Sequence, residues 1–126
     1  MPKLDKKKIL AVVDDLLFTV KINDAAKRAG MDAEFVKSEK DVMDKLRDKP
    51  VLIIFDLNAN CVDSVELIGK LKSNPESKSI SLIGFLSHVQ GELKMKAQEA
   101  GANMVMARSA FSQNLQQILK RHAGVI

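Results

Sequence analysis

The sequence predicts an α/β fold in which one parallel sheet is covered by helices on both faces. Three observations indicate this class. Short apolar runs bounded by polar or turn residues have the length of strands that are buried on both sides. Between these runs, apolar residues recur at helical spacing. Strand-like and helix-like segments then alternate five times, which is typical of a parallel sheet with helical crossovers.

Five strands are expected from the apolar runs. The strongest runs cover residues 9–13, 51–55 and 80–86, and none of them alternates strictly between apolar and polar residues. Such alternation would be expected if only one face of the strand were buried. Two weaker strands fit the gaps at residues 33–37 and 103–107. Five strands connected in this way suit the doubly wound, flavodoxin-like sheet with strand order 2-1-3-4-5.

Five helices are expected, one after each strand. Gly30 stands where the first helix should end, because glycine commonly follows a last helical turn. Residues 38–41 resemble a capping box that opens the second helix, and Asp63 or Ser64 can cap the third. The apolar faces of the five helices lie at residues 18–29, 42–46, 67–71, 89–100 and 111–119.

Length and composition suit a single domain over residues 1–126. Hydrophobic residues make up 46% of the chain and charged residues 29%, which is too apolar for a disordered protein. The apolar runs are too short to form a transmembrane helix, and the lysine-rich start lacks the apolar segment of a signal peptide. Cys61 is the single cysteine and has no internal disulfide partner, so a cytoplasmic protein is expected.

The chain carries a formal net charge of +4, partly from lysines near its start. A basic balance raises the hypothesis of a nucleic-acid-associated protein. The sequence has no Trp or Tyr, and no expected helix carries a basic stripe, so solvated lysines are the favoured interpretation. An enzyme that turns over a small molecule is also disfavoured, because the sequence has no glycine-rich phosphate loop, nucleophile elbow or Cys/His cluster.

Acidic residues follow two strands that should be neighbours in the sheet. Asp14 and Asp15 follow the first strand, and Asp56 follows the third. Ligands of such sheets bind beyond the carboxyl ends of the strands, so these carboxylates should converge. Three close carboxylates repel one another unless a cation joins them, and Mg²⁺ is the natural candidate. A metal there could support phosphoryl transfer to a carboxylate, which indicates an aspartyl-phosphate site.

The opposite rim of this edge carries a hydroxyl and a cation. Ser87 follows the fourth strand, and Arg108 follows the fifth. A hydroxyl and a guanidinium in these places could hold the remaining oxygens of a phosphoryl group.

In these residues and their order the sequence resembles a response-regulator receiver domain of two-component signalling, over nearly the whole chain. The resemblance implies that Asp56 is the phosphoacceptor and that Asp14 and Asp15 bind Mg²⁺ with it, Asp15 more directly. It also implies that the backbone carbonyl of Asn58 is a metal ligand and that Ser87 contacts the phosphoryl group.

The sequence departs from the family at several positions, as an atypical receiver or a pseudo-receiver would. Arg108 replaces a lysine, and Ser109 replaces a proline that usually follows a cis bond. A cis bond without proline costs about 2.5–4 kcal/mol, so a trans Arg108–Ser109 bond is expected. Asn60 and Ser64 replace a usual proline and glycine, and Val105 replaces the aromatic switch residue. Arg108 could clamp the phosphoryl group, or it could pair with Asp56 and hold one state without phosphate.

The resemblance implies a stand-alone signalling module and not an enzyme. A histidine kinase or phosphotransfer protein would phosphorylate Asp56, and the response would be contact with a downstream protein. The contact face would involve the fourth helix, fifth strand and fifth helix, roughly residues 89–120. The alternative is a pseudo-receiver that acts as an interaction module without phosphorylation, with Arg108 neutralising the acidic cluster.

Overall fold

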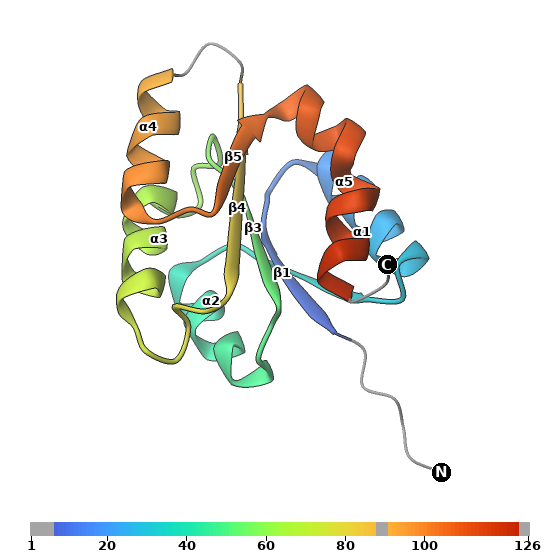
Figure 1. Cartoon of the computed structure of the whole chain (residues 1–126), viewed down its shortest axis with the longest axis horizontal. Helices are drawn as coiled ribbons and strands as arrows, with labels where there is room; N and C mark the ends of the chain where they lie inside the picture. Colours follow the sequence, from blue (N-terminus) through green and yellow to red (C-terminus); the bar gives the residue numbers. More distant parts are fainter. Residues whose placement is uncertain (1–6, 88–90, 124–126) are drawn as a thin grey trace.

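The computed structural model describes residues 7–87 and 91–123, which form a parallel five-stranded sheet between two layers of helices (Figure 1). The strand order is β2-β1-β3-β4-β5, and every neighbouring pair is parallel. The predicted fold class and strand order are therefore confirmed. The strands are β1 (Lys8–Val12), β2 (Asp32–Val36), β3 (Leu52–Asp56), β4 (Ser81–Leu86) and β5 (Met104–Ala107).

The five predicted helices are also present. They are α1 (Leu16–Arg28), α2 (Glu39–Lys45), which continues into the 3₁₀ turn η1 (Leu46–Asp48), α3 (Ser64–Ser73), α4 (Gly91–Ala100) and α5 (Arg108–Ala123). Ser38 and Asp63 cap α2 and α3, as their sequence positions suggested. Val89, which was expected in the fourth helix, lies outside the described residues. No helix in the described ranges has the length and apolar character needed to cross a membrane.

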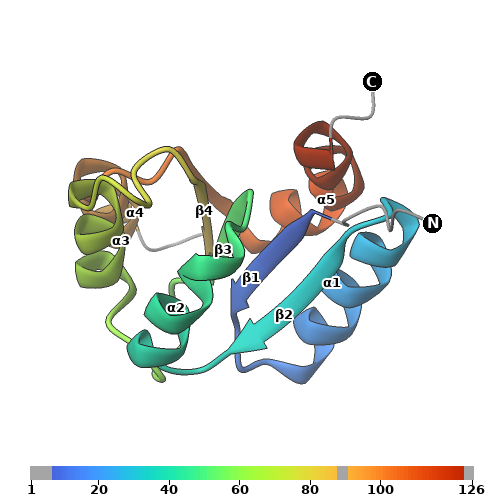
Figure 2. The ribbon, with the colours of Figure 1, turned by 90° about the horizontal axis from the view of Figure 1, so that it is seen from below.

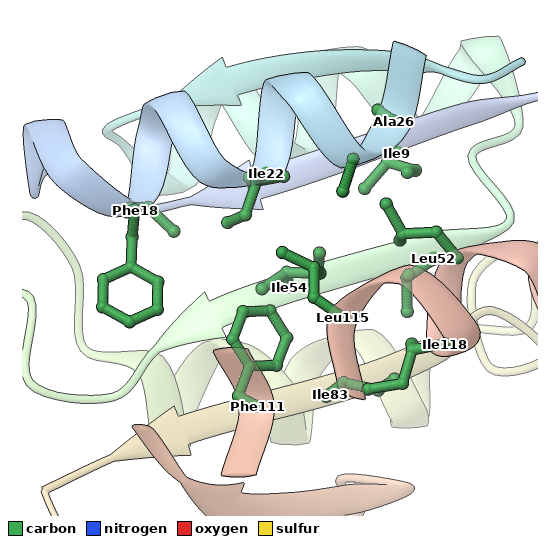
Figure 3. Close-up of a cluster of buried hydrophobic side chains, with 14 of the residues drawn as sticks. Ile9, Phe18, Ile22, Ala26, Leu52, Ile54, Ile83, Phe111, Leu115 and Ile118 are labelled. Carbon is green, nitrogen blue, oxygen red and sulfur yellow. The ribbon is translucent and has the colours of Figure 1, made fainter. Parts of the chain in front are cut away.

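The helices divide between the two faces of the sheet (Figure 2). α1 and α5 pack on one face, over a core that includes Ile54, Phe111 and Leu115 (Figure 3). α2, α3 and α4 cover the other face, where Ile53 is among the buried residues. Both faces of β3 are therefore apolar, because successive side chains of a strand point to opposite sides. This arrangement explains why the central strands have uninterrupted apolar sequences.

The sheet brings the ends of β1, β3 and β4 to one edge. Val12 is paired with Phe55 in the sheet register, and Asp56 is paired with Phe85. The residues that follow β1 therefore lie beside the last residue of β3. This is the point at which the strand order reverses and where sheets of this type bind ligands.

Candidate functional site

Asp56 is a buried carboxylate at the carboxyl end of β3, with 2% of its surface exposed. Its Oδ1 accepts a hydrogen bond of 3.0 Å from the backbone N–H of Asn58. Its Oδ2 lies 3.6 Å from Nη2 of Arg108. Burial raises the pKa of Asp56, while the Asn58 N–H and the Arg108 charge act in the opposite direction. The neighbouring charges of Asp14 and Asp15 add to the upward shift of this pKa.

Asp15 connects the acidic edge to the start of α1. Its Oδ1 accepts hydrogen bonds from the backbone N–H groups of Leu17 and Phe18, at 2.8 and 3.4 Å, so Asp15 is the N-cap of α1. Its Oδ2 lies 3.7 Å from Nη1 of Arg108. Asp14 is exposed and close enough for its charge to act on Asp56. The expected convergence of acidic residues from β1 and β3 is present in the fold.

Arg108 lies between the two carboxylates, with one terminal nitrogen toward each of them. Both distances are those of ion pairs rather than short hydrogen bonds. The Nε atom of Arg108 is buried and has no hydrogen-bond acceptor among the described residues. The Arg108–Ser109 peptide bond is trans, as predicted. β5 passes directly into α5 at Arg108, so the side chain starts from the first residue of that helix.

Two phenylalanines support the guanidinium of Arg108. Its central carbon is 5.2 Å from the ring centre of Phe18 and 5.8 Å from that of Phe85. The two rings stack at 4.8 Å, and Phe111 stacks on Phe85 at 4.6 Å. A guanidinium over aromatic faces gains cation–π attraction and loses freedom to move. The aromatic cluster thus helps to orient Arg108 toward the acidic pair.

Ser87 and Asn58 form the other rim of the site. The side-chain Oδ1 of Asn58 accepts hydrogen bonds from the backbone N–H of Ser87 at 3.0 Å and from its Oγ at 3.4 Å. Asn58 therefore ties the loop after β3 to the end of β4. The resemblance implied a role only for the backbone carbonyl of Asn58, as a metal ligand. The hydrogen bonds from Ser87 to the Asn58 side chain were therefore not predicted.

Arg108 occupies the space beside two of the carboxylates expected to bind a metal ion. The Oδ2 atoms of Asp15 and Asp56 both face Arg108, and their Oδ1 atoms accept backbone hydrogen bonds. Within residues 7–87 and 91–123, no group of three or more Asp, Glu, His or Cys side chains is placed to hold a metal ion. The positive charge beside the carboxylates of Asp15 and Asp56 is the guanidinium of Arg108. The assignment of Asp14, Asp15, Asp56 and Asn58 as Mg²⁺ ligands therefore stays a prediction.

The sequence prediction and the structure agree on which candidate residues share the edge. Asp56 is the last residue of β3, and Arg108 reaches the same edge from α5. The other candidate residues follow strand ends as expected: Asp14, Asp15, Asn58 and Ser87. Val105, at the position of the aromatic switch residue, is buried in β5.

The aromatic support under Arg108 was not expected from the sequence. Phe18 lies three residues after Asp15, and Phe85 lies just before the end of β4. The positions of Phe85 near the end of a strand and of Phe18 in the first turn of the following helix were the available signals, but the apolar patterns had already accounted for both as core residues.

Solved structures with a similar fold define the class of domain. The chain matches the phosphorylated cyanobacterial phytochrome response regulator RcpA with a TM-score of 0.76 and 24% identity, covering 93% of this chain and 91% of that one. It matches the chemotaxis response regulator CheY4 of Vibrio cholerae with a TM-score of 0.78 and 18% identity, covering 94% and 99%. No family model and no curated protein matches the sequence.

A third similar structure contains a metal. It is the receiver domain of a sensor histidine kinase from Pseudomonas aeruginosa, with a magnesium ion coordinated in its active-site cleft. The TM-score is 0.79 at 19% identity, and the match covers 95% of this chain and 99% of that one. The protein therefore has the fold of a response-regulator receiver domain, and the resemblance noted in its sequence is confirmed at the level of the fold.

Proposed function

We propose that the protein is a signalling domain that acts through contact with other proteins and does so without phosphorylation. It is not an enzyme with a small-molecule substrate. The observation that carries this proposal is the position of Arg108, whose terminal nitrogens lie 3.7 Å from Asp15 and 3.6 Å from Asp56. In this interpretation Arg108 supplies the positive charge for which a receiver otherwise needs a metal ion.

The chemistry of arginine supports a permanent arrangement. A guanidinium stays protonated at every physiological pH, and its planar fork can face two carboxylates at once. The rings of Phe18 and Phe85 restrict the orientation of Arg108. A buried, ionised Asp56 is costly without a compensating charge, so the pairing is favoured whenever no other cation is present.

A phosphorylation-dependent receiver is the second candidate. It is supported by Asp56 at the end of β3, by the Ser87 hydroxyl beside Asn58, and by the receiver fold itself. In this candidate a histidine kinase or phosphotransfer protein would phosphorylate Asp56. Ser87 and Arg108 would hold the phosphoryl oxygens. Mg²⁺ would bind Asp14, Asp15, Asp56 and the carbonyl of Asn58.

Exposed apolar side chains support protein contact in both candidates. Met95 on α4 and Met104 on β5 have 60% and 42% of their surfaces exposed, and both lie on the expected face of α4, β5 and α5. Leu16, Leu17 and Val20 are exposed on α1, beside the acidic edge. Methionine and leucine on a surface are typical of partner contacts. We expect the protein to act in the cytoplasm, where the free thiol of Cys61 would stay reduced.

One experiment separates the two candidates. The protein is incubated with Mg²⁺ and acetyl phosphate, and its intact mass is measured; a parallel sample is titrated with Mg²⁺ and beryllofluoride while its amide spectrum is followed by NMR. The proposal expects no adduct and no saturable spectral change. A labile adduct of about 80 Da that is lost in Asp56→Asn would overturn it and establish the second candidate.

Arg108→Lys serves as the matched variant, because it restores the family residue and keeps the positive charge. A lysine is a compact charge on a flexible stem and does not bridge two carboxylates as a guanidinium fork does. Under the proposal, Arg108→Lys should respond to Mg²⁺ more strongly than the wild-type protein. An equal response in both proteins would show that Arg108 does not block the acidic pair.

A further inference from the structure

A pocket of about 570 Å³ lies on the side of Arg108 that faces α1 and α5. These two helices lie side by side on one face of the sheet (Figures 1 and 2). Two cations, Lys21 and Arg108, line the pocket together with the hydroxyls of Ser87, Ser109 and Ser112. None of its described lining residues is acidic, and Asp56 is not among them. The pocket therefore lies beside the acidic edge and shares Ser87 and Arg108 with the candidate site.

Lys21 brings to this pocket a positive charge that is not paired with a carboxylate in the part of the chain that the structure describes. Its Nζ donates a hydrogen bond of 3.0 Å to the Oγ of Ser112 and lies 5.5 Å from the ring centre of Phe18. Across the described ranges, no acidic side chain forms an ion pair with Lys21. An ammonium group has three N–H donors, so Lys21 can bind a further acceptor while it keeps its bond to Ser112.

The start of α5 adds donors of the same kind. Ser109 and Ser112 belong to the beginning of this helix, which runs from Arg108 to Ala123. The first turn of a helix has backbone N–H groups without helical partners and carries a partial positive charge. This contribution supplements the two cationic side chains and the hydroxyls, which are the main evidence for an anion site. The buried Nε of Arg108, which has no acceptor among the described residues, adds to the local excess of donors.

We infer that this pocket binds a small phosphate ester non-covalently. Lys21 supplies a positive charge that no acidic side chain in the described ranges pairs with, and Arg108 and several hydroxyls add donors for the many acceptor oxygens of a phosphate group. The volume is in the range of pockets for small molecules and exceeds what a single inorganic ion needs. The apolar surface of Phe18 and Ala107 in the lining can contact the organic part of the ligand. No covalent step is involved, and the ligand is expected on the unphosphorylated protein, in which Ser87 and Arg108 do not hold a phosphoryl group on Asp56.

The test is an amide NMR titration of the full chain at constant ionic strength, with a chelator present to exclude divalent cations. The probes are inorganic phosphate and phenyl phosphate, with chloride balancing the charge. We expect saturable shifts concentrated at residues 18–21 and 108–113, and tighter binding of phenyl phosphate than of inorganic phosphate. Linear shifts spread over surface lysines would overturn the inference, because they would indicate general ionic attraction.

Two matched variants locate the site. Lys21→Met keeps the apolar stem and should weaken phosphate binding at least about tenfold, which corresponds to about 1.4 kcal/mol. Lys27→Met removes an exposed lysine of the same helix that does not line the pocket, and its affinity should match that of the wild-type protein. Equal affinities in the two variants would overturn the inference.

Asp56→Asn separates this pocket from the acidic edge. The substitution removes a negative charge near Arg108, so phosphate should bind at least as tightly as it does to the wild-type protein. Loss of binding in Asp56→Asn would show that binding needs the Asp56 carboxylate, which an anion pocket beside Lys21 does not, and would contradict the inference. A wild-type protein that forms an adduct on Asp56 and still binds phosphate in the presence of chelator would overturn only the proposed function.

Discussion

Asp56 is held between opposing electrostatic effects. Burial and the charges of Asp14 and Asp15 raise its pKa, while Arg108 and the N–H of Asn58 lower it. The net shift is upward from the ordinary value of 3.8, so ionised Asp56 is less favourable in the folded protein than in the unfolded chain. Arg108 therefore reduces the cost of the buried charge without removing it.

The upward shift leads to a pH-dependent prediction for Asp56→Asn. A raised pKa contributes stability that is fully present below the pKa of the unfolded chain and is lost as the pH rises through the pKa of the folded protein. An asparagine at this position is neutral at every pH, so the variant does not lose this stability as the pH rises. The free energy of unfolding of Asp56→Asn, relative to the wild-type protein, should therefore increase between pH 3 and pH 7.

Urea unfolding of both proteins across this pH range measures the difference. The amide oxygen of asparagine can still accept the hydrogen bond from the N–H of Asn58, which makes the comparison clean. If the free energy of unfolding of Asp56→Asn, relative to the wild-type protein, instead decreased toward pH 7, the pairing of Asp56 with Arg108 would outweigh the cost of burying the Asp56 charge.

At the scale of the element, Asp15 serves both the helix and the site. One carboxylate oxygen caps α1 and the other faces Arg108. The start of the helix and the position of the negative charge are therefore coupled. A change that alters the geometry of the cap also alters the distance to Arg108.

Substitutions at Asp15 can separate these two roles. Asparagine is as good a helix cap as aspartate but carries no charge, whereas alanine lacks both functions. Asp15→Ala should lower the free energy of unfolding by about 1 kcal/mol more than Asp15→Asn. Thermal or urea unfolding measures this difference. Equal losses in the two variants would show that the cap contributes little and that the charge accounts for the whole effect.

The junction of β5 and α5 determines where Arg108 points. The strand ends at Ala107 and the helix begins at the next residue, so no loop separates them. A cation at a helix N-terminus is unfavourable with respect to the helix dipole. Asp15 and Asp56 supply the compensating charge, which explains how an arginine is accommodated at this position.

At the scale of the whole molecule, a single sheet separates two apolar cores. Ile53 and Ile54 are consecutive in β3, both have no exposed surface, and they belong to different cores. The carboxyl end of β3 that carries Asp56 is thus supported from both sides.

Ile53→Ala and Ile54→Ala test this shared support. Each substitution removes buried apolar groups and leaves a cavity, at a cost of about 2–5 kcal/mol. Both variants should unfold in one cooperative transition, because every strand belongs to the same sheet. Urea unfolding followed by circular dichroism is the measurement. A variant within about 1 kcal/mol of the wild-type protein would indicate that its core relaxes around the gap.

Most element positions could be predicted because their local signals were strong. The runs around Ile53 and Ile83 are buried on both faces, so their strands begin and end within a residue or two of the apolar residues. The caps Ser38 and Asp63 hydrogen-bond as their types suggest. The start of α5 was harder to locate, because the residues before Phe111 lack a helical apolar pattern and begin with an unfavourable arginine.

The sheet, its strand order and the proximity of Asp14, Asp15 and Asp56 at one edge could all be predicted from the sequence alone. These features follow from apolar periodicity and from the parallel direction of the strands, and both can be read along the chain. The sequence left open whether Arg108 clamps a phosphoryl group or pairs with the acidic residues. The tertiary structure places Arg108 beside Asp15 and Asp56, over the rings of Phe18 and Phe85, and forms the pocket beside Lys21. Each of these features brings together residues that are far apart in the sequence. Local sequence patterns do not predict how close such residues lie in the folded protein.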